Sequence, residues 1–387
     1  RAGLGYQRLP MLMTWVFVAA AAVFLMRARL RVTVHPDVPA DELSRFEGTL
    51  LVALWVLVLI HVLLVAINLI WSPVPAWDAT LHWSIKPRVW FALGEWVPFV
   101  EKDIWLANPM PSAYTDNEPN YPLFTPLLQL WTATLLGGWE PSLVNLPWLL
   151  CYLVLISLFY GATRALGGNA VHAALFTFLL ASLPLLNTHV AFAGNADLFM
   201  GTAWLAAVVS LLLWRQSSSV GWLACLLIFA CTCILVKNEG LFWSAALLPG
   251  LLLVVLPRKL AYVLILGAGV VAGVLLWIFP NDLPVAGHTL EKLRLAYRGR
   301  ALAPTLMSMF NLSSWHLLYP AFLVALLLYC RLGRATRAAL EPLLVVLLAA
   351  YSLFFVLFLF TGYAWGAVRF TAVSRINLAL VPATMLW

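Results

Sequence analysis

The chain has 387 residues, of which 63% are hydrophobic and only 10% charged, and its mean hydropathy is +0.93. Soluble domains average roughly 45–50% apolar and 25% charged residues, so this composition excludes a soluble protein and indicates a membrane protein with many spans. The net charge of +7 and pI near 9.3 do not indicate nucleic-acid binding, because the cations are scattered over short loops, as membrane orientation requires. The apolar runs are continuous and do not alternate, which excludes a closed β-barrel.

The apolar runs predict an all-α polytopic protein with about 11 spans in a single domain covering residues 1–387. The predicted spans are 11–26, 49–70, 142–162, 170–187, 197–213, 220–236, 241–256, 260–279, 316–330, 342–361 and 375–387. The chain starts at Arg1 and stops at Trp387 within an apolar run, so we expect trimmed ends and allow for a missing C-terminal part. All five cysteines lie within apolar runs and are expected to be small buried hydrophobes.

The short basic loops predict the orientation of the spans. If the loop after the first span is cytoplasmic, alternation places Arg164, Arg215, Arg258 and the basic residues after residue 330 on the same side, as the positive-inside rule requires. This alternation holds only if the apolar run from Tyr121 to Leu136 does not cross the membrane, so we expect an interfacial helix there. The opposite, outer side then carries 11 of the 16 acidic residues. A transporter would instead place ionisable groups near mid-membrane, often within two related halves.

Two long outer loops, residues 71–141 and 281–315, hold much of the unusual polar sequence. In the first, Asp78 follows an apolar run and the sequence WSPVPAW. A carboxylate of this kind is ionised at neutral pH and can accept a proton from a hydroxyl, although an exposed carboxylate or a helix N-cap explains it equally well. Asp116 and Glu118 form a second carboxylate pair in the same loop, suited to the base role or to orienting an acceptor.

The layout from Trp71 to Arg375 resembles the GT-C class of integral-membrane glycosyltransferases. The resemblance is carried by an Asp near the start of a long outer loop, by the Pro-bounded aromatic stretch Glu118-Pro119-Asn120-Tyr121-Pro122-Leu123, and by polar corners between apolar helices. The members it resembles most use polyprenyl-phosphate sugars, as do protein O-mannosyltransferases and lipid A aminoarabinose transferases. The resemblance implies that Asp78 is the catalytic base and that Tyr121 to Leu136 is one of the class's interfacial helices.

Four further polar corners between apolar helices are expected to complete the site, and the first two lie at Asn195 to Asp197 and at Lys237 to Glu239. Asn195 and Asp197 stand at the start of a helix, where Asp197 is either a cap or helix-dipole partner or, with Asn195, part of a sugar-binding surface. Lys237 and Glu239 are squeezed between apolar spans, where they either pair with each other or hold a lipid phosphate and orient a substrate.

The second outer loop and the last outer corner contribute the remaining predicted site residues. Arg294 and Arg298 share a helical face if this segment is helical, and such a guanidinium pair suits phosphate oxygens or anionic head groups. His288 and Tyr297 are candidate sugar contacts. Arg375 begins an apolar run and is expected to pair with a donor phosphate or with Glu239.

These residues predict inverting transfer of a sugar from a polyprenyl-phosphate donor to a hydroxyl of a lipid, glycan or protein acceptor. Asp78 removes the acceptor proton, and Arg and Lys side chains stabilise the departing phosphate. No cofactor is expected; a divalent metal held by Asp78 with Asp116 or Glu118 is not favoured. The expected location is a bacterial inner or plasma membrane, with the site on the periplasmic side. The alternatives are a glycan polymerase or ligase that uses a diphosphate-linked lipid and a lipid or solute transporter.

Overall fold

The computed structural model describes residues 41–73, 78–278, 284–285 and 288–387. Across these residues the chain is mostly helical, with two very short two-stranded sheets, so the prediction of an all-α membrane protein is confirmed at this level. The predicted first span, 11–26, lies outside the described residues.

The helices in the first half of the chain include two short non-α helices, η1 and η2. Their bounds are α2 (Arg45–Trp71), the π-helix η1 (Ala79–Trp83), α3 (Ile85–Leu93), α4 (Lys102–Ala107), α5 (Phe124–Leu136), the 3₁₀ helix η2 (Leu143–Asn145), α6 (Leu146–Ala165), α7 (Ala170–Ala181), α8 (Pro184–Ala191) and α9 (Asp197–Ser217). The helices that follow are α10 (Val220–Val236), α11 (Gly240–Ala245), α12 (Leu248–Val255), α13 (Arg258–Ile278), α14 (Leu290–Leu293), η3 (Gly299–Ala301), α15 (Leu302–Met309), α16 (Leu312–Trp315), α17 (Leu318–Tyr329), α18 (Arg334–Phe360), α19 (Ala364–Val368), α20 (Val373–Leu378) and α21 (Val381–Leu386).

Five helical segments of the described chain are long and apolar enough to cross a membrane, namely α2, η2 with α6, α9, α13 and α18. The pair α7 and α8 adds a sixth if its 62° bend is one broken span. Three predicted spans are divided by prolines that begin a new helix: Pro184 in 170–187, Pro249 in 241–256 and Pro382 in 375–387. Proline has no backbone N–H to continue a helix but fits its first turn, so it marks a break. The span count of 11 stays a prediction.

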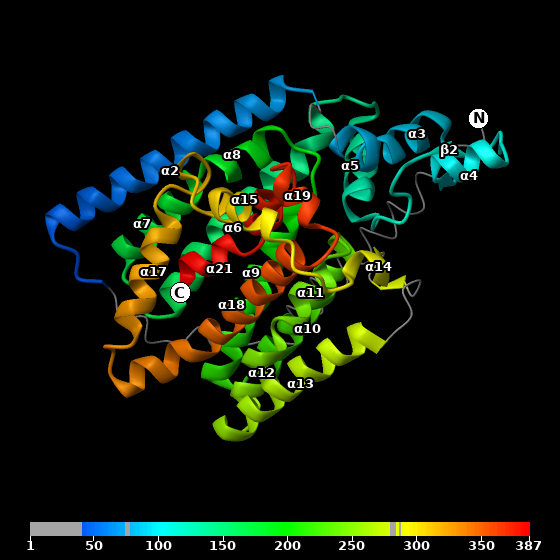
Figure 1. Ribbon diagram of the computed structural model, residues 1–387. Coiled ribbons are helices and arrows are strands. Elements are labelled where there is room, and N and C mark those ends of the chain that lie inside the picture. Colours follow the sequence, from blue (N-terminus) through cyan, green and yellow to red (C-terminus); the bar gives the residue numbers. More distant parts are fainter. Residues whose placement is uncertain (1–40, 74–77, 279–283, 286–287) are drawn as a thin grey trace.

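Helix α9 forms the centre of the bundle and is buried along most of its length. It packs against α10 and α6, and the short helices α20 and α21 close over it from the C-terminal part of the chain. By contrast, α2 and α13 lie at the edges of the bundle (Figure 1) and expose apolar side chains along most of their surface. Such a surface is compatible with lipid and not with water.

The basic loops predicted to share one side of the membrane meet at one end of the bundle. There Arg164 binds Asp41 at 2.5 Å, and Arg258 binds Glu341 at 2.6 Å. Arg215, at the end of α9, donates to backbone carbonyls at the start of α18 at 2.7 Å. Asp78, Asp197, Lys237 and Arg375 meet at the other end, which we call the site end. The sorting of polar groups into two ends is therefore observed, whereas the compartment that each end faces stays a prediction.

At the site end, the segment after α2 forms a lobe beside the bundle (Figure 1). Helix α3 packs on α5, and strand β1 (Phe99–Val100) pairs in parallel with β2 (Tyr114–Thr115). The helix predicted at Tyr121 begins at Phe124 and has 13 residues, ending at Gly137 with φ 71°. At 1.5 Å per residue it is roughly 20 Å long, too short for a hydrocarbon core of about 30 Å. Its length therefore agrees with an interfacial helix and not with a span.

Candidate active site

Asp78 lies where the chain leaves the first described span and enters the lobe. It directly precedes η1, a π-helix, a rare element that is frequent at functional sites. The side chain makes no capping hydrogen bond to this helix, so the N-cap interpretation is wrong. Instead its Oδ2 forms an ion pair with Nη1 of Arg375, 297 positions later in the chain. The Asp78 side chain remains 38% exposed, so a substrate can reach the carboxylate.

Arg375 connects Asp78 to the start of α9. Its Nε lies 3.3 Å from Oδ2 of Asp197, and its Nη2 lies 3.5 Å from Oδ1 of Asn195. The planar guanidinium thus uses three of its nitrogens for three different residues, which a lysine cannot do. The predicted pairing of Arg375 with Glu239 is not seen among the described contacts. Its partners are Asp78 and Asp197.

Asp197 is the common partner of two cations. Its Oδ1 accepts a hydrogen bond from Lys237 Nζ at 2.9 Å, and its Oδ2 faces Arg375. The N-cap of α9 is Ala196, so Asp197 is not the capping residue; it lies in the first turn of α9, where a carboxylate is favoured by the helix dipole, as predicted. Lys237 also lies 3.4 Å from Glu239 and is buried, so these pairs explain it without a lipid phosphate. We call Asp78, Asn195, Asp197, Lys237, Glu239 and Arg375 the Arg375 cluster.

Two glycines allow the backbone to present this cluster. Gly194 has a φ of 113°, in the left-handed region that favours glycine, and it directly precedes Asn195. Trp148 then fixes the turn, because its Nε1 donates to the Asn195 carbonyl at 2.7 Å. Gly240 comes directly after Glu239 in the sequence, and a Cβ at position 240 would lie 1.9 Å from the backbone oxygen of Cys233. The turn that carries Lys237 and Glu239 therefore requires glycine at position 240.

We expect Gly240→Ala to destabilise the protein by about 1–3 kcal/mol, the usual cost of overpacking a filled site. Replacing glycine by alanine in a helix normally stabilises a protein, so a loss of stability in this variant would point to the steric clash with Cys233. The matched control is Gly267→Ala in α13, where nothing lies within 4 Å of an added Cβ. Unfolding of both variants by detergent titration measures the difference. Equal stability of the two would show that the turn at Gly240 adapts freely.

A second charged group lies in the lobe, formed by His82, Lys86 and Asp116, which we call the Asp116 triad. Nδ1 of His82 is 2.5 Å from Oδ1 of Asp116, and Nζ of Lys86 is 3.0 Å from Oδ2. Lys86 also donates to the carbonyls of Glu118 and Pro119, at 3.3 and 3.1 Å. The Asp116 side chain is completely buried, so it cannot receive a proton from a substrate. The predicted base role of Asp116 is therefore wrong, and its contacts make it the anchor of the other two residues.

The pKa values of Asp116 and His82 follow from the contacts that Asp116 makes with both His82 and Lys86. Burial alone would raise the pKa of Asp116, but hydrogen bonds from His82, the Glu118 amide and Lys86 outweigh it and lower that pKa. The hydrogen bond to Asp116 raises the pKa of His82, and the charges of Asp116, Asp78 and Glu118 add to the effect. The imidazole is thereby biased toward its protonated form.

Tyr121 lies between the triad and the Arg375 cluster. Its ring stacks on Trp83 at 4.9 Å and meets His82 edge-on at 5.9 Å. Burial raises the pKa of Tyr121, and the charges of Glu239, Glu118 and Asp78 raise it further, which places it near both groups. Burial also raises the pKa of Glu118.

His82 and Lys86 were not predicted as site residues, although their spacing from Asp78 in the sequence points to them. Asp78, His82 and Lys86 follow one another at intervals of four residues, the spacing that places side chains on one helical face. The structure shows helical backbone through nearly all of this stretch, in η1 and α3.

The second outer loop differs from its prediction. Helix α14 ends at Leu293, and the next residues are extended, with amides of Ala296 and Arg298 bonded to carbonyls at the end of α18. Arg294 and Arg298 are exposed and, within the described residues, form no ion pair, so the predicted shared helical face is wrong. The reason is that main-chain pairing to α18 replaces the helix.

The two residues of this loop that were predicted to contact a sugar, His288 and Tyr297, are not among the described contacts of the Arg375 cluster. Tyr297 is exposed and packs on Phe360, with ring centroids 5.5 Å apart. The backbone of His288 belongs to the short strand β4 (His288–Thr289), which pairs with β3 (Pro284–Val285), whereas its side chain lies outside the described residues.

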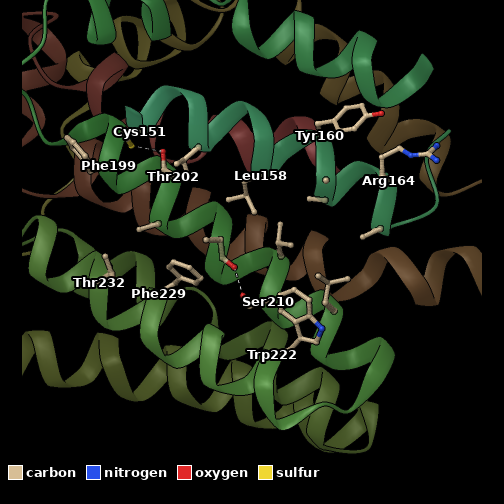
Figure 2. Close-up of a pocket in the computed structure, with 18 of the residues that line it drawn as sticks. Cys151, Leu158, Tyr160, Arg164, Phe199, Thr202, Ser210, Trp222, Phe229 and Thr232 are labelled. Carbon is tan, nitrogen blue, oxygen red and sulfur yellow. Dashed lines mark hydrogen bonds between the residues drawn. The ribbon is translucent and has the colours of Figure 1, made fainter. Parts of the chain in front are cut away.

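An apolar cavity of about 660 Å³ lies within the helical bundle (Figure 2). It is lined by α6, α9 and α10, and Figure 2 shows Phe199 and Arg164 at its two ends. Phe199 is two residues from Asp197, and the lining residue Val236 directly precedes Lys237. From Phe199 to Gln216 the cavity follows 18 residues of α9, roughly 25 Å of helix. It therefore extends along most of a membrane's thickness, and one end lies at the level of the turn of α9 that carries Asp197.

Among the residues that the structure describes, no three His, Cys, Asp or Glu side chains are gathered as a metal site needs, and metal dependence stays open. Comparison of the chain with protein-family models, curated proteins and solved structures found no match. The resemblance to the GT-C class therefore rests on the layout of the chain's own residues.

Proposed function

We propose that this protein is a membrane glycosyltransferase that moves a sugar from a polyprenyl-phosphate donor to a hydroxyl acceptor with inversion. The observation that carries the proposal is the accessible carboxylate of Asp78, oriented by Arg375 at the site end of a membrane-embedded bundle. A guanidinium that binds one oxygen leaves the second free to accept a proton from an attacking hydroxyl.

The apolar cavity supports a lipid-linked donor. Its walls are almost entirely apolar, and it starts within two residues of Asp197 and Lys237. A long isoprenoid chain in this cavity would hold its phosphate at the site end of the bundle. The tail is already surrounded by hydrocarbon in the bilayer, so the cavity positions the donor and adds little hydrophobic affinity. A phosphate-linked sugar carries its own leaving group, and no nucleotide is required.

The decisive experiment uses the full chain in nanodiscs with a polyprenyl-phosphate donor carrying a radiolabelled sugar and with an envelope extract as acceptor. We expect the label to leave the donor and to appear in a product that is stable to mild acid. In sealed proteoliposomes, a transporter would instead move the label across the bilayer on an unchanged carrier. That second result would overturn the proposal.

A further inference from the structure

The donor phosphate needs a cationic partner, and two of the four cations assigned to it from sequence, Lys237 and Arg375, are already engaged. Within the Arg375 cluster, the three carboxylates of Asp78, Asp197 and Glu239 face the two cations Arg375 and Lys237, a net charge of −1. Such a cluster repels an anion. Arg294 and Arg298, the other predicted phosphate ligands, contact neither charged group among the described residues.

The Asp116 triad has the opposite balance. One buried carboxylate is shared by Lys86 and His82, so the triad carries a net charge of +1 when the imidazole is protonated. The charged groups around His82 are Asp116 after β2, Lys86 of α3 through Asp116, Asp78 before η1 and Glu118 in the following loop. Asp78 is paired with Arg375, and Glu118 faces Lys292 of α14, so each of these two outer carboxylates has a cation of its own. The ring of Tyr121 covers one side of the imidazole. Three of these groups are carboxylates, which stabilise the imidazolium.

The geometry of His82 leaves one donor for a ligand. Its Nδ1 is held by Asp116, and within the described chain Nε2 has no hydrogen-bond partner. The side chain is 12% exposed, and it lies four residues from Asp78 on the same helical stretch. A buried carboxylate behind one ring nitrogen fixes the direction of the other, as in sites where a histidine is oriented for function.

We infer that His82 binds the phosphate of a lipid monophosphate through Nε2–H, with Asp116 and Lys86 as positioning residues. This inference rests on the proposed function and assigns its donor-phosphate site. As the bond between the anomeric carbon and the phosphate oxygen breaks, its electron pair passes to that oxygen. The imidazolium stabilises the resulting charge, while the acceptor oxygen bonds to the same carbon and its proton passes to Asp78. The proton on Asp78 then returns to solvent.

Binding of decaprenyl monophosphate, which carries no sugar, tests the inference without any transfer reaction. We expect the affinity of the full chain in nanodiscs to fall as the pH rises from 6 to 9, because the imidazolium is lost. The second ionisation of a phosphate monoester has a pKa near 6, so the ligand gains negative charge over this range. Ionisation of the ligand alone would strengthen binding to a cationic site. A loss of affinity must therefore come from the protein.

His82→Gln keeps a hydrogen bond to Asp116 but cannot carry the charge. We expect this variant to bind about 10- to 100-fold more weakly at pH 6, the range of a charge-assisted hydrogen bond, and to show no loss toward pH 9. Asp116→Asn should move the alkaline loss of affinity to lower pH, which a merely structural role would not do. The control is His172→Gln, an exposed histidine at the opposite end of the bundle, which should keep the wild-type profile.

Affinity of the wild type that does not fall between pH 6 and 9, or unchanged binding by His82→Gln at pH 6, would overturn the assignment of His82. If the wild type transfers sugar but gives either result, only this inference fails. If it neither binds the lipid phosphate nor transfers sugar, the inference and the proposed function fail together.

Discussion

Replacing Asp78 by Asn is expected to lower the turnover rate at least 100-fold while leaving donor binding nearly unchanged. The amide has the shape of the carboxylate and can still accept a hydrogen bond from Arg375, but it cannot take the proton of the attacking hydroxyl. General base catalysis contributes typically 10²–10⁴-fold, which sets the size of the loss. Initial rates with a labelled polyprenyl-phosphate sugar and a separate donor-binding titration measure the two effects.

The matched control for Asp78→Asn is Asp103→Asn. Asp103 is an exposed carboxylate of α4 in the same lobe, and its loss changes the net charge by the same amount. It should keep full activity. Retention of more than about a tenth of wild-type activity by Asp78→Asn would remove Asp78 from the base role.

Arg375→Gln is expected to have the largest effect on stability, about 3 kcal/mol, together with loss of transfer. Its removal leaves three carboxylates facing Lys237 alone, so the cluster changes from a net charge of −1 to −2. Breaking a buried ion pair on one side costs 3–5 kcal/mol, and the Arg375 side chain is 27% exposed, so we take the lower end. Detergent titration of the folded protein measures the change.

Two further variants separate charge from geometry at Arg375. Arg375→Lys keeps the charge but loses the fork that reaches Asp78, Asn195 and Asp197 together, so it should recover most of the stability and little of the activity. The double variant Asp78→Asn with Arg375→Gln restores the net charge of −1 and should be more stable than Arg375→Gln alone. Arg369→Gln, an exposed cation stacked over Trp365, is the control and should cost less than 1 kcal/mol. Equal losses for Arg369 and Arg375 would show that the cluster does not couple these groups.

The sequence was sufficient to place the polar corners at one end of the bundle. Asp78, Asp197, Lys237 and Arg375 all stand next to apolar runs, and alternation of those runs puts them on one side. The structure brings the four into one cluster. Which residue binds which was not predictable, because the Asp78 to Arg375 contact joins positions 297 apart and depends on how α20 packs on α9.

Three other patterns in the sequence led to predictions that the structure corrects. The apolar run 375–387 was predicted as a span, yet its 13 residues are too short for one, and Pro382 lies in the first turn of a separate helix within it. Arg294 and Arg298 had helical spacing, but the backbone of this segment pairs with α18 instead. Asp116 looked like a free carboxylate because its partner Lys86 lies 30 positions earlier in the chain. Long-range pairing overrode the local pattern in the last two cases.

The link between Asp78 and Arg375 also has a consequence for biosynthesis. A ribosome adds about 5–20 residues per second, so Arg375 is made roughly 15–60 s after Asp78. During that interval α2 and the lobe can already lie in the membrane, while Asp78 and Asp197 still await the guanidinium that orients one and neutralises the other. The contact between Asp78 and Arg375 can therefore form only after α20 has been synthesised, so the two carboxylates wait for a partner that comes from the far end of the sequence.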